Sequence, residues 1–410
     1  MGSVLVEMTN HKNVIDMKKL SVLLLLLLSV VGATANDGAY YAQGNQLIPI
    51  TDSDISVKKE ILSVTRKGYI IKVDVYYEFF NPTKPKNLIV GFEAMSPDPY
   101  GNYMLDQLPY QPYIKNFNVV MNGEQLTYDV AQVTSTQYDE EKQAYVKPKY
   151  YIDGRLLQWT RQQCIDAVGA DDFYDTCPFD YVYHFDAYFK EGVNIVQHTY
   201  DFVMGEDTEV EWAFSYVLTA ANRWANNGID DFTLNVNMGA CESFQIPSYF
   251  FESGDEWTIN GKGKIISDAE SYFYSIPCPL FHVQSGCATF HKTEFHPEGE
   301  LVVYKPLQWV FWVSCGDPKS CELILEAMRE QYYDFESTMF DYREFAKGMN
   351  PNQKRIMRNM PFAYQGHVFN DKELRKYFES AQWYIPDPNY KDDMSKMSQK
   401  EKEWIQFWSK

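Results

Sequence analysis

The sequence lacks the short motifs by which many enzymes are recognised. Neither Gly-x-Ser-x-Gly, His-Glu-x-x-His nor a glycine-rich phosphate loop occurs in its 410 residues. Cys-x-x-Cys is absent as well, which argues against a zinc ribbon or a dithiol redox centre. The carboxylates of glycosidases come from distant strands and carry no motif. The sequence therefore favours a non-enzymatic protein and leaves an extracellular hydrolase, with its site on the β-rich part, as the alternative.

Positive charge is scarce. The chain carries 37 Lys and Arg against 56 Asp and Glu, a formal net charge of −19 at pH 7. Such a surface repels nucleic acid and anionic lipid, so neither is an expected partner. The simpler explanation of this charge is a soluble exported protein with an acidic surface. The more specific alternative is that this surface binds a cationic partner.

No hydrophobic run is long enough to span a membrane. The longest extends from Leu20 to Val31 and falls short of the ~20 apolar residues that a spanning helix requires. Two lysines, Lys18 and Lys19, precede it, and Ala33-Thr34-Ala35 places small residues where a signal peptidase recognises them. Residues 1–35 therefore predict a signal peptide cleaved before Asn36, with no transmembrane anchor after processing.

Processing determines the compartment that we expect. No cysteine follows the cleavage site, so the lipid attachment of bacterial lipoproteins is missing. We expect a periplasmic or extracellular protein whose true start is either Met1 or Met17. Loss of three lysines and two acidic residues moves the formal charge from −19 to −20.

Cysteines are few but sufficient for disulfides. The chain has seven, a number that in an exported protein indicates disulfides with one residue left over. The closest neighbours are Cys164 with Cys177, Cys278 with Cys287 and Cys315 with Cys321, which leaves Cys241. Spacing does not establish connectivity, so the six paired residues are disulfide candidates. Each short loop would add ~2–3 kcal/mol.

Residues 36–316 show the pattern of strands. The segment 71–79 alternates apolar and polar residues, which places its apolar side chains on one face. It follows a strand predicted at 55–64, and Thr65-Arg66-Lys67-Gly68 is a hairpin-sized connection that contains a glycine. Asn122-Gly123-Glu124 connects a second predicted hairpin. Further strands are predicted at 88–92, 209–219, 232–237, 256–266 and 299–313. Many short strands without long helices between them favour an antiparallel β-sandwich.

One segment interrupts the strands. Asp153 is placed to cap a helix from Gly154 to Val168, which we interpret as a helical insertion in the sandwich. Exposed aromatic rings beside carboxylates are typical of glycan-binding surfaces, whereas buried rings fill a core, and core packing is the favoured interpretation. The aromatic residues near this segment are Tyr145, Tyr150, Tyr151, Trp159, Phe173, Tyr174, Tyr181 and Tyr183.

Residues 287–296 have some metal-ligand character. Cys287, His291, Glu294 and His296 could supply ligands to a metal ion. On a strand, His291 and His296 are an odd number of residues apart and point to opposite faces, so a site would need a bend or bulge. The sequence therefore predicts no metal site, catalytic residue or cofactor, and it leaves the binding residues unknown.

Helical periodicity begins after residue 316. Apolar residues at steps of one, three or four along 319–348 predict a long helix with one buried stripe. Asn350-Pro351 supplies an N-cap and a first-turn proline for a helix that continues toward Tyr364, and Gly366 is placed to end it in a left-handed turn. Ser398 with Glu401 predicts the start of a last helix. Residues 317–410 are therefore predicted to form a small, mainly helical domain.

The stretch 358–388 is the most specific pattern in the chain, and it resembles the YARHG domain of exported bacterial proteins. Phe362, Ala363 and Gly366 stand at the Tyr, Ala and Gly positions of the Tyr-Ala-Arg-His-Gly motif, whereas Tyr364 and Gln365 replace its Arg and His. Asn370 with Glu373 then predicts a helix start. We expect five aromatic residues to form the core of this domain: Phe362, Phe369, Tyr377, Phe378 and Trp383. The resemblance implies export but names no reaction.

The first part of the chain resembles an uncharacterised β-rich domain found at the mature N-terminus of exported bacterial proteins. That resemblance rests on Ala35-Asn36-Asp37, the early strand pair and the segments 216–224 and 229–234. The patterns together predict an α+β protein: a signal peptide at 1–35, an antiparallel β-sandwich with a helical insertion at 36–316, and a helical YARHG-like domain at 317–410. We expect binding or interaction in the bacterial cell envelope, with an envelope glycan or protein as partner.

Overall fold

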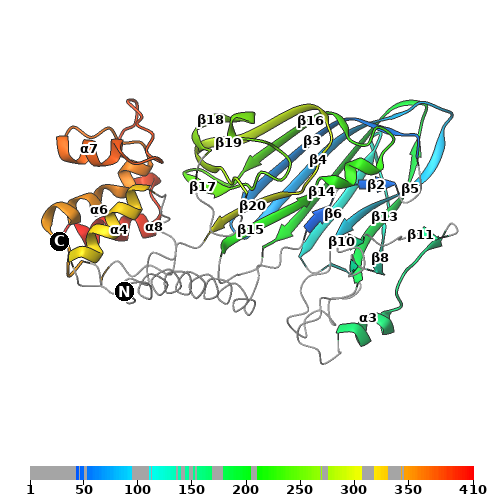
Figure 1. Cartoon of the computed structure of the whole chain (residues 1–410), viewed down its shortest axis with the longest axis horizontal. Coiled ribbons are helices and arrows are strands. Elements are labelled where there is room, and N and C mark those ends of the chain that lie inside the picture. The colour runs from blue at the N-terminus through cyan, green and yellow to red at the C-terminus, as the bar shows by residue number, and fades with distance from the viewer. Residues whose placement is uncertain are drawn as a thin grey trace, which may run out of the picture. The chain divides into compact units, whose positions relative to one another are not determined.

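A computed structural model describes most of the chain from residue 43 onward. The described residues are 53–94, 110–134 without 112, 155–168, 179–204, 210–267, 276–306, 318–330 and 346–410, with residues 269 and 343 and five short strands between 43 and 152. The protein is mostly β, with a few helices that lie mainly near the C-terminus (Figure 1), which fits the α+β expectation in its broad form. The predicted signal peptide lies outside the described residues.

The first long hairpin follows from the alternation in the sequence. Strands β3 (Ser56–Lys67) and β4 (Ile70–Asn81) pair antiparallel, and Val73, Val75 and Tyr77 are fully buried on one face of β4. Pairing continues to the end of β3, so the turn is shorter than the predicted 65–68 connection. Gly68 stands in it with φ +61°, which glycine tolerates at no steric cost.

The larger sheet has twelve strands in the order β1-β15-β20-β17-β19-β16-β3-β4-β14-β6-β7, with β18 paired to β19. Its remaining strands are β1 (Gln43–Asn45), β6 (Ile114–Met121), β7 (Glu124–Gln125), β14 (Gly192–Val203), β15 (Val210–Val217), β16 (Ile229–Asn237), β17 (Glu242–Gln245), β18 (Trp257–Ile266), β19 (Leu280–Phe295) and β20 (Leu301–Pro306). The β6–β7 turn contains Asn122 and Gly123 at positive φ, which confirms the second predicted hairpin.

The expectation of a purely antiparallel arrangement is wrong for two strand pairs. Strand β16 pairs parallel with β3, and β1 pairs parallel with β15. A hairpin can join only antiparallel neighbours, whereas strands that are far apart in sequence can pair in either direction. Side-chain alternation indicates a buried face but carries no information about strand direction.

A second sheet of four strands packs against the larger one. Its order is β2 (Leu47–Pro49), β5 (Lys86–Ala94), β13 (Phe179–Phe189) and β8 (Asp129–Thr134). The ring of Phe92 on β5 lies 5.0 Å from Phe117 on β6 and 5.4 Å from His198 on β14, measured between centroids. Aromatic residues from both sheets therefore fill the core between them.

The helix predicted at residues 154–168 is shorter than expected and follows two pairs of short strands. Strands β9 (Gln137–Asp139) and β10 (Ala144–Val146) pair, as do β11 (Tyr151–Ile152) and β12 (Arg155–Leu156), and helix α3 covers Arg161–Val168. The helix does not begin at Gly154, because the two residues that follow it belong to a strand. Two short 3-10 turns, η1 (Thr219–Arg223) and η2 (Gly254–Glu256), lie elsewhere in the β-rich part.

Strands β18 and β19 approach each other closely at two glycines. Gly261 has φ +139° and Gly286 has φ +94°. A Cβ atom on Gly286 would lie 1.9 Å from the carbonyl oxygen of Asn260, and one on Gly261 would lie 2.1 Å from that of Ser285. Only glycine fits at both positions, and the register shifts just beyond them, between Lys262 and Gly263.

The helical part contains α4 (Pro318–Glu330), α6 (Pro351–Tyr364), α7 (Lys372–Glu379), η4 (Met394–Lys396) and α8 (Gln399–Trp408), and Figure 1 shows its helices in yellow, orange and red. Asn350 caps α6 and Ser398 caps α8, each in a reciprocal capping box, as the sequence predicts. Gly366 has φ +92°, which confirms the left-handed turn after α6. The cap of α7 is Asp371 rather than Asn370, because its carboxylate accepts from the backbone amides of Glu373 and Leu374.

The aromatic core predicted for this part is confirmed. Phe369, Phe378 and Trp383 are buried, while Phe362 and Tyr377 pack against the same cluster. The indole of Trp383 donates to the carbonyl of Met328 on α4, at 2.9 Å. Among the described helices none is long and apolar enough to cross a membrane.

Candidate functional site

Cys278 and Cys287 are not bonded to each other. Cys287 lies within the extended strand β19 and Cys278 precedes that strand, and each residue of a strand adds about 3.3 Å, so the two lie on the order of 20 Å apart. The sulfur of Cys278 is 3.3 Å from the hydroxyl of Tyr304, and that of Cys287 is 3.7 Å from the hydroxyl of Thr289. Proximity in sequence was misleading here because the intervening chain is extended.

The other two cysteine pairs stay predictions. Cys177 and Cys315, the expected partners of Cys164 and Cys321, lie outside the described residues. Cys241 is half-buried with its sulfur 3.7 Å from the carbonyl oxygen of Tyr364. Burial raises the pKa of its thiol to about 11, so it is a weak nucleophile at neutral pH.

The group at 287–296 is not brought together as a metal site. His291 Nε2 lies 2.9 Å from the carboxylate of Asp231, whereas His296 Nδ1 donates to the carbonyl of Asn227, 2.7 Å away. Within the part of the chain that the structure describes, no three potential ligands are grouped to hold a metal ion.

The described aromatic residues near the insertion lie in or against the core. Tyr181 and Tyr183 on β13 are buried, and the Trp159 ring packs 5.9 Å from Phe179. This confirms the core interpretation for these three residues. The side chains of Tyr145, Tyr150, Tyr151, Phe173 and Tyr174 lie outside the described residues.

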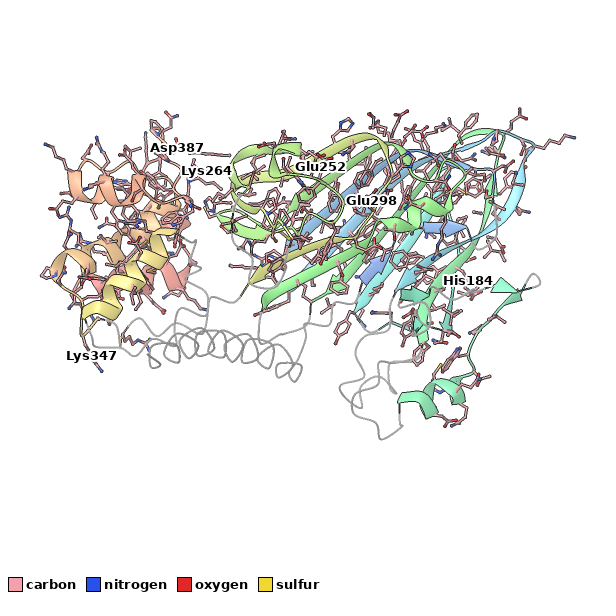
Figure 2. The ribbon with its side chains drawn as sticks, viewed as in Figure 1. His184, Glu252, Lys264, Glu298, Lys347 and Asp387 are labelled. Atoms are coloured by element: carbon pink, nitrogen blue, oxygen red, sulfur yellow. The ribbon has the colours of Figure 1, made fainter. Side chains whose placement is uncertain are left out.

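A pocket of about 530 Å³ opens beside this region, at the edge of the four-stranded sheet. Asp129 on the edge strand β8 lies directly opposite His184 on β13 in the strand register, and Figure 2 labels His184. Gln158, which follows β12, bridges to Val133 of the same edge strand. The lining residues are Tyr110, Tyr128, Asp129, Val130, Gln158 and His184.

The two tyrosines of this pocket differ in their packing: Tyr128 packs against the core, whereas Tyr110 is exposed to solvent. The Tyr128 ring stacks edge-on against Phe117 at 4.9 Å and lies 5.8 Å from Tyr183, which anchors it to the core. Tyr110 is 58% exposed. The pocket thus presents one fixed ring and one accessible ring.

The polar groups of the pocket can both donate and accept hydrogen bonds. Burial lowers the pKa of His184, against the opposing effect of Asp129 and Asp186, so its imidazole is neutral at pH 7. A neutral imidazole and the Gln158 amide each offer a donor and an acceptor, and the Asp129 carboxylate offers acceptors. No lysine or arginine is among the described lining residues.

A second arrangement joins Ser243 on β17 to His282 on β19. The serine oxygen lies 2.8 Å from His282 Nδ1. Both side chains are buried, and burial lowers the pKa of His282 to about 4. In serine hydrolases the histidine contacts the nucleophile through Nε2. Here the His282 ring is turned the other way and faces the serine with Nδ1.

Neither arrangement was found from the sequence. The pocket combines residues from β8, β13 and three positions outside the strands, and Ser243 and His282 are 39 positions apart. No local motif connects residues that meet only through strand pairing. The crowding of aromatic residues between 145 and 183 does not indicate the pocket, because its two rings, Tyr110 and Tyr128, lie outside that range.

No curated protein matches the sequence. A crystal structure of a proposed nutrient binding protein from Legionella pneumophila is 15% identical, with 91% of this chain and 100% of that chain covered and a TM-score of 0.43. Baculovirus P35 is 10% identical, with 64% and 99% covered and a TM-score of 0.22. Residues 330–410 match the YARHG domain, which supports the resemblance found in the C-terminal sequence.

Proposed function

We propose that the protein is a non-enzymatic, exported binding protein of the bacterial cell envelope, and that its pocket takes a small hydroxyl-rich ligand such as a glycan fragment. One observation carries this proposal. The pocket at Tyr110 and Tyr128 sets aromatic rings beside a carboxylate, an amide and a neutral imidazole.

The chemistry of these groups suits a sugar. Aromatic rings pack on the apolar faces of ligands, and a few placed polar groups determine the ligand's orientation. A volume of about 530 Å³ falls in the usual range of roughly 300–1,000 Å³ for small-molecule sites. Export is supported by the leader-like residues 18–35 and by the YARHG match.

A hydrolase is the second candidate, and the Ser243–His282 contact is the observation that favours it. The burial of Ser243 and His282 argues against a hydrolase, because a substrate carbonyl must reach the serine oxygen. We expect no labelling of Ser243 by a fluorophosphonate probe. Labelling that disappears in Ser243→Ala would instead establish the hydrolase.

The binding proposal is tested on a glycan array of cell-wall and chitin oligosaccharides, followed by calorimetry with the strongest hit. We expect Tyr110→Ala and Asp129→Asn each to weaken binding by tenfold or more. Tyr249→Ala is the matched control, because Tyr249 is 41% exposed and does not line the pocket. Equal affinity in all three variants would place the ligand elsewhere, and no hit on the array would contradict the ligand class.

A further inference from the structure

Lys264 reaches from the β18–β19 hairpin into the helical part of the chain. Its ammonium group donates to the carbonyl oxygens of Tyr384 and Gln382, at 2.6 and 3.2 Å. Lys264 is half-buried, and burial lowers its pKa. Two carbonyl acceptors thus replace part of the water that this cation gives up.

A second set of contacts meets the end of α6. The side-chain amide of Gln284 on β19 donates to the carbonyl of Tyr364, at 3.3 Å, and the thiol of Cys241 points to the same oxygen. Tyr364 is the last residue of α6. The last carbonyls of a helix have no partner within it, so donors from the hairpin region satisfy one here.

Gly366 lies where these contacts converge. A Cβ atom on it would lie 2.9 Å from the amide nitrogen of Gln284 and 2.9 Å from the carbonyl of Ile385. Its own carbonyl accepts from the amide of Asp387, whose carboxylate lies 3.1 Å from Lys262 Nζ. Figure 2 labels Lys264 and Asp387, one from each side of this contact.

We propose that the loop after α6, with Gly366 at its centre, and the segment 382–384 after α7 together form a docking element for the β18–β19 hairpin of the same chain, and that Lys264 is its main anchor. The acceptors are backbone carbonyls of Tyr364, Gln382 and Tyr384. A backbone carbonyl is present whatever side chain stands at 364 or 365. Docking therefore survives the replacement of the motif's Arg and His by Tyr364 and Gln365, provided that the glycine is kept.

This docking is independent of the proposed ligand pocket. The pocket belongs to β8, β13 and their neighbours, and none of its lining residues takes part in the hairpin contacts. Loss of glycan binding would leave the docking inference unchanged, and loss of docking would leave the pocket intact.

The thiol of Cys241 offers a readout of docking. It lies against the Tyr364 carbonyl, and its raised pKa results mainly from burial. We expect Lys264→Met and Gly366→Ala to increase its rate of alkylation by iodoacetamide tenfold or more, measured by peptide mass mapping of the full native chain. Lys292→Met is the matched control: it removes a lysine from the same hairpin, paired with Glu256 and 42% exposed.

Cys287 serves as the internal reference in the same digest. It lies on β19 beside Thr289, away from the Tyr364 carbonyl, so undocking should not change its alkylation rate. Equal rates of Cys241 alkylation in Lys264→Met and Lys292→Met would refute the role of Lys264 as the anchor. A parallel rise at Cys241 and Cys287 would also refute it, since the variant would then unfold the hairpin rather than release the loop.

Discussion

His198 is fully buried between the two sheets, among aromatic rings. The rings of Phe92 and Tyr77 meet it edge-on at 5.4 and 5.8 Å. Neither ring nitrogen has a hydrogen-bond partner among the described residues. A charged imidazole would therefore be strongly disfavoured, because nothing described around it replaces the lost water.

This burial predicts a fold that is sensitive to acid. Burial lowers the pKa of His198 to about 3, against about 6.5 in an unfolded chain. At a pH between these two pKa values, His198 is protonated in the unfolded chain and neutral in the folded chain. Stability is therefore full above about pH 6.5 and decreases as the pH falls toward 3, by on the order of 5 kcal/mol at the end of that range.

Urea unfolding at pH 7.5, 6.0 and 5.0 measures the effect. At pH 5.0 we expect His198 to account for about 2 kcal/mol of lost stability, which His198→Phe should abolish. Part of the slope will persist, because burial also lowers the pKa of His282, to about 4. His291→Gln, at a side chain that is 57% exposed, should keep the wild-type slope. A wild-type slope in His198→Phe would contradict this account.

At the scale of the elements, Glu242 joins three strands through buried charges. It stands on β17, accepts from Arg66 at the end of β3, and lies 2.9 Å from Lys305 Nζ on β20. The Arg66 guanidinium also stacks on the Trp212 ring of β15, 4.9 Å from its centroid. Lys305 and Glu242 are only 5% and 9% exposed at their side chains.

We expect Glu242→Gln to lower the free energy of unfolding by about 3–5 kcal/mol, because it removes the anion that neutralises two partly buried cations. Asp230→Asn is the matched control, since it breaks the Lys58 ion pair, in which both side chains are 42% exposed. That loss should stay below about 1 kcal/mol. Urea unfolding at pH 7.5 compares the two variants, and similar losses would show that burial does not govern these ion pairs.

The elements that could be predicted are those encoded locally. The β3–β4 and β6–β7 hairpins follow from alternation and a turn glycine, and α6 and α8 follow from their capping residues. The parallel pairing of β3 with β16 could not be predicted, because Ile61 meets Thr233 only in the folded chain. Asp371 took the cap expected of Asn370 because neighbouring polar residues can both cap a helix, and backbone geometry decides between them.

At the scale of the whole molecule, the candidate pocket depends on the same non-local pairing. Asp129 and His184 become neighbours only when β8 pairs with β13. Gln158 joins them through a bridge to Val133. Sequence reasoning could therefore indicate the kinds of residue that a binding surface uses, but not which of them share one pocket.

Processing is the prediction that concerns the chain as a whole. Lys18 and Lys19, the apolar run from Leu20 and the small residues Ala33-Thr34-Ala35 predict cleavage before Asn36. The intact mass of protein recovered from the periplasm or medium of a bacterial host should match a chain that begins at Asn36. Ala35→Pro should block cleavage, because signal peptidase requires a small residue at that position, while Ala39→Pro, beyond the site, should leave it unchanged. Uncleaved wild-type chain in the membrane fraction would show that residues 20–31 act as an anchor instead.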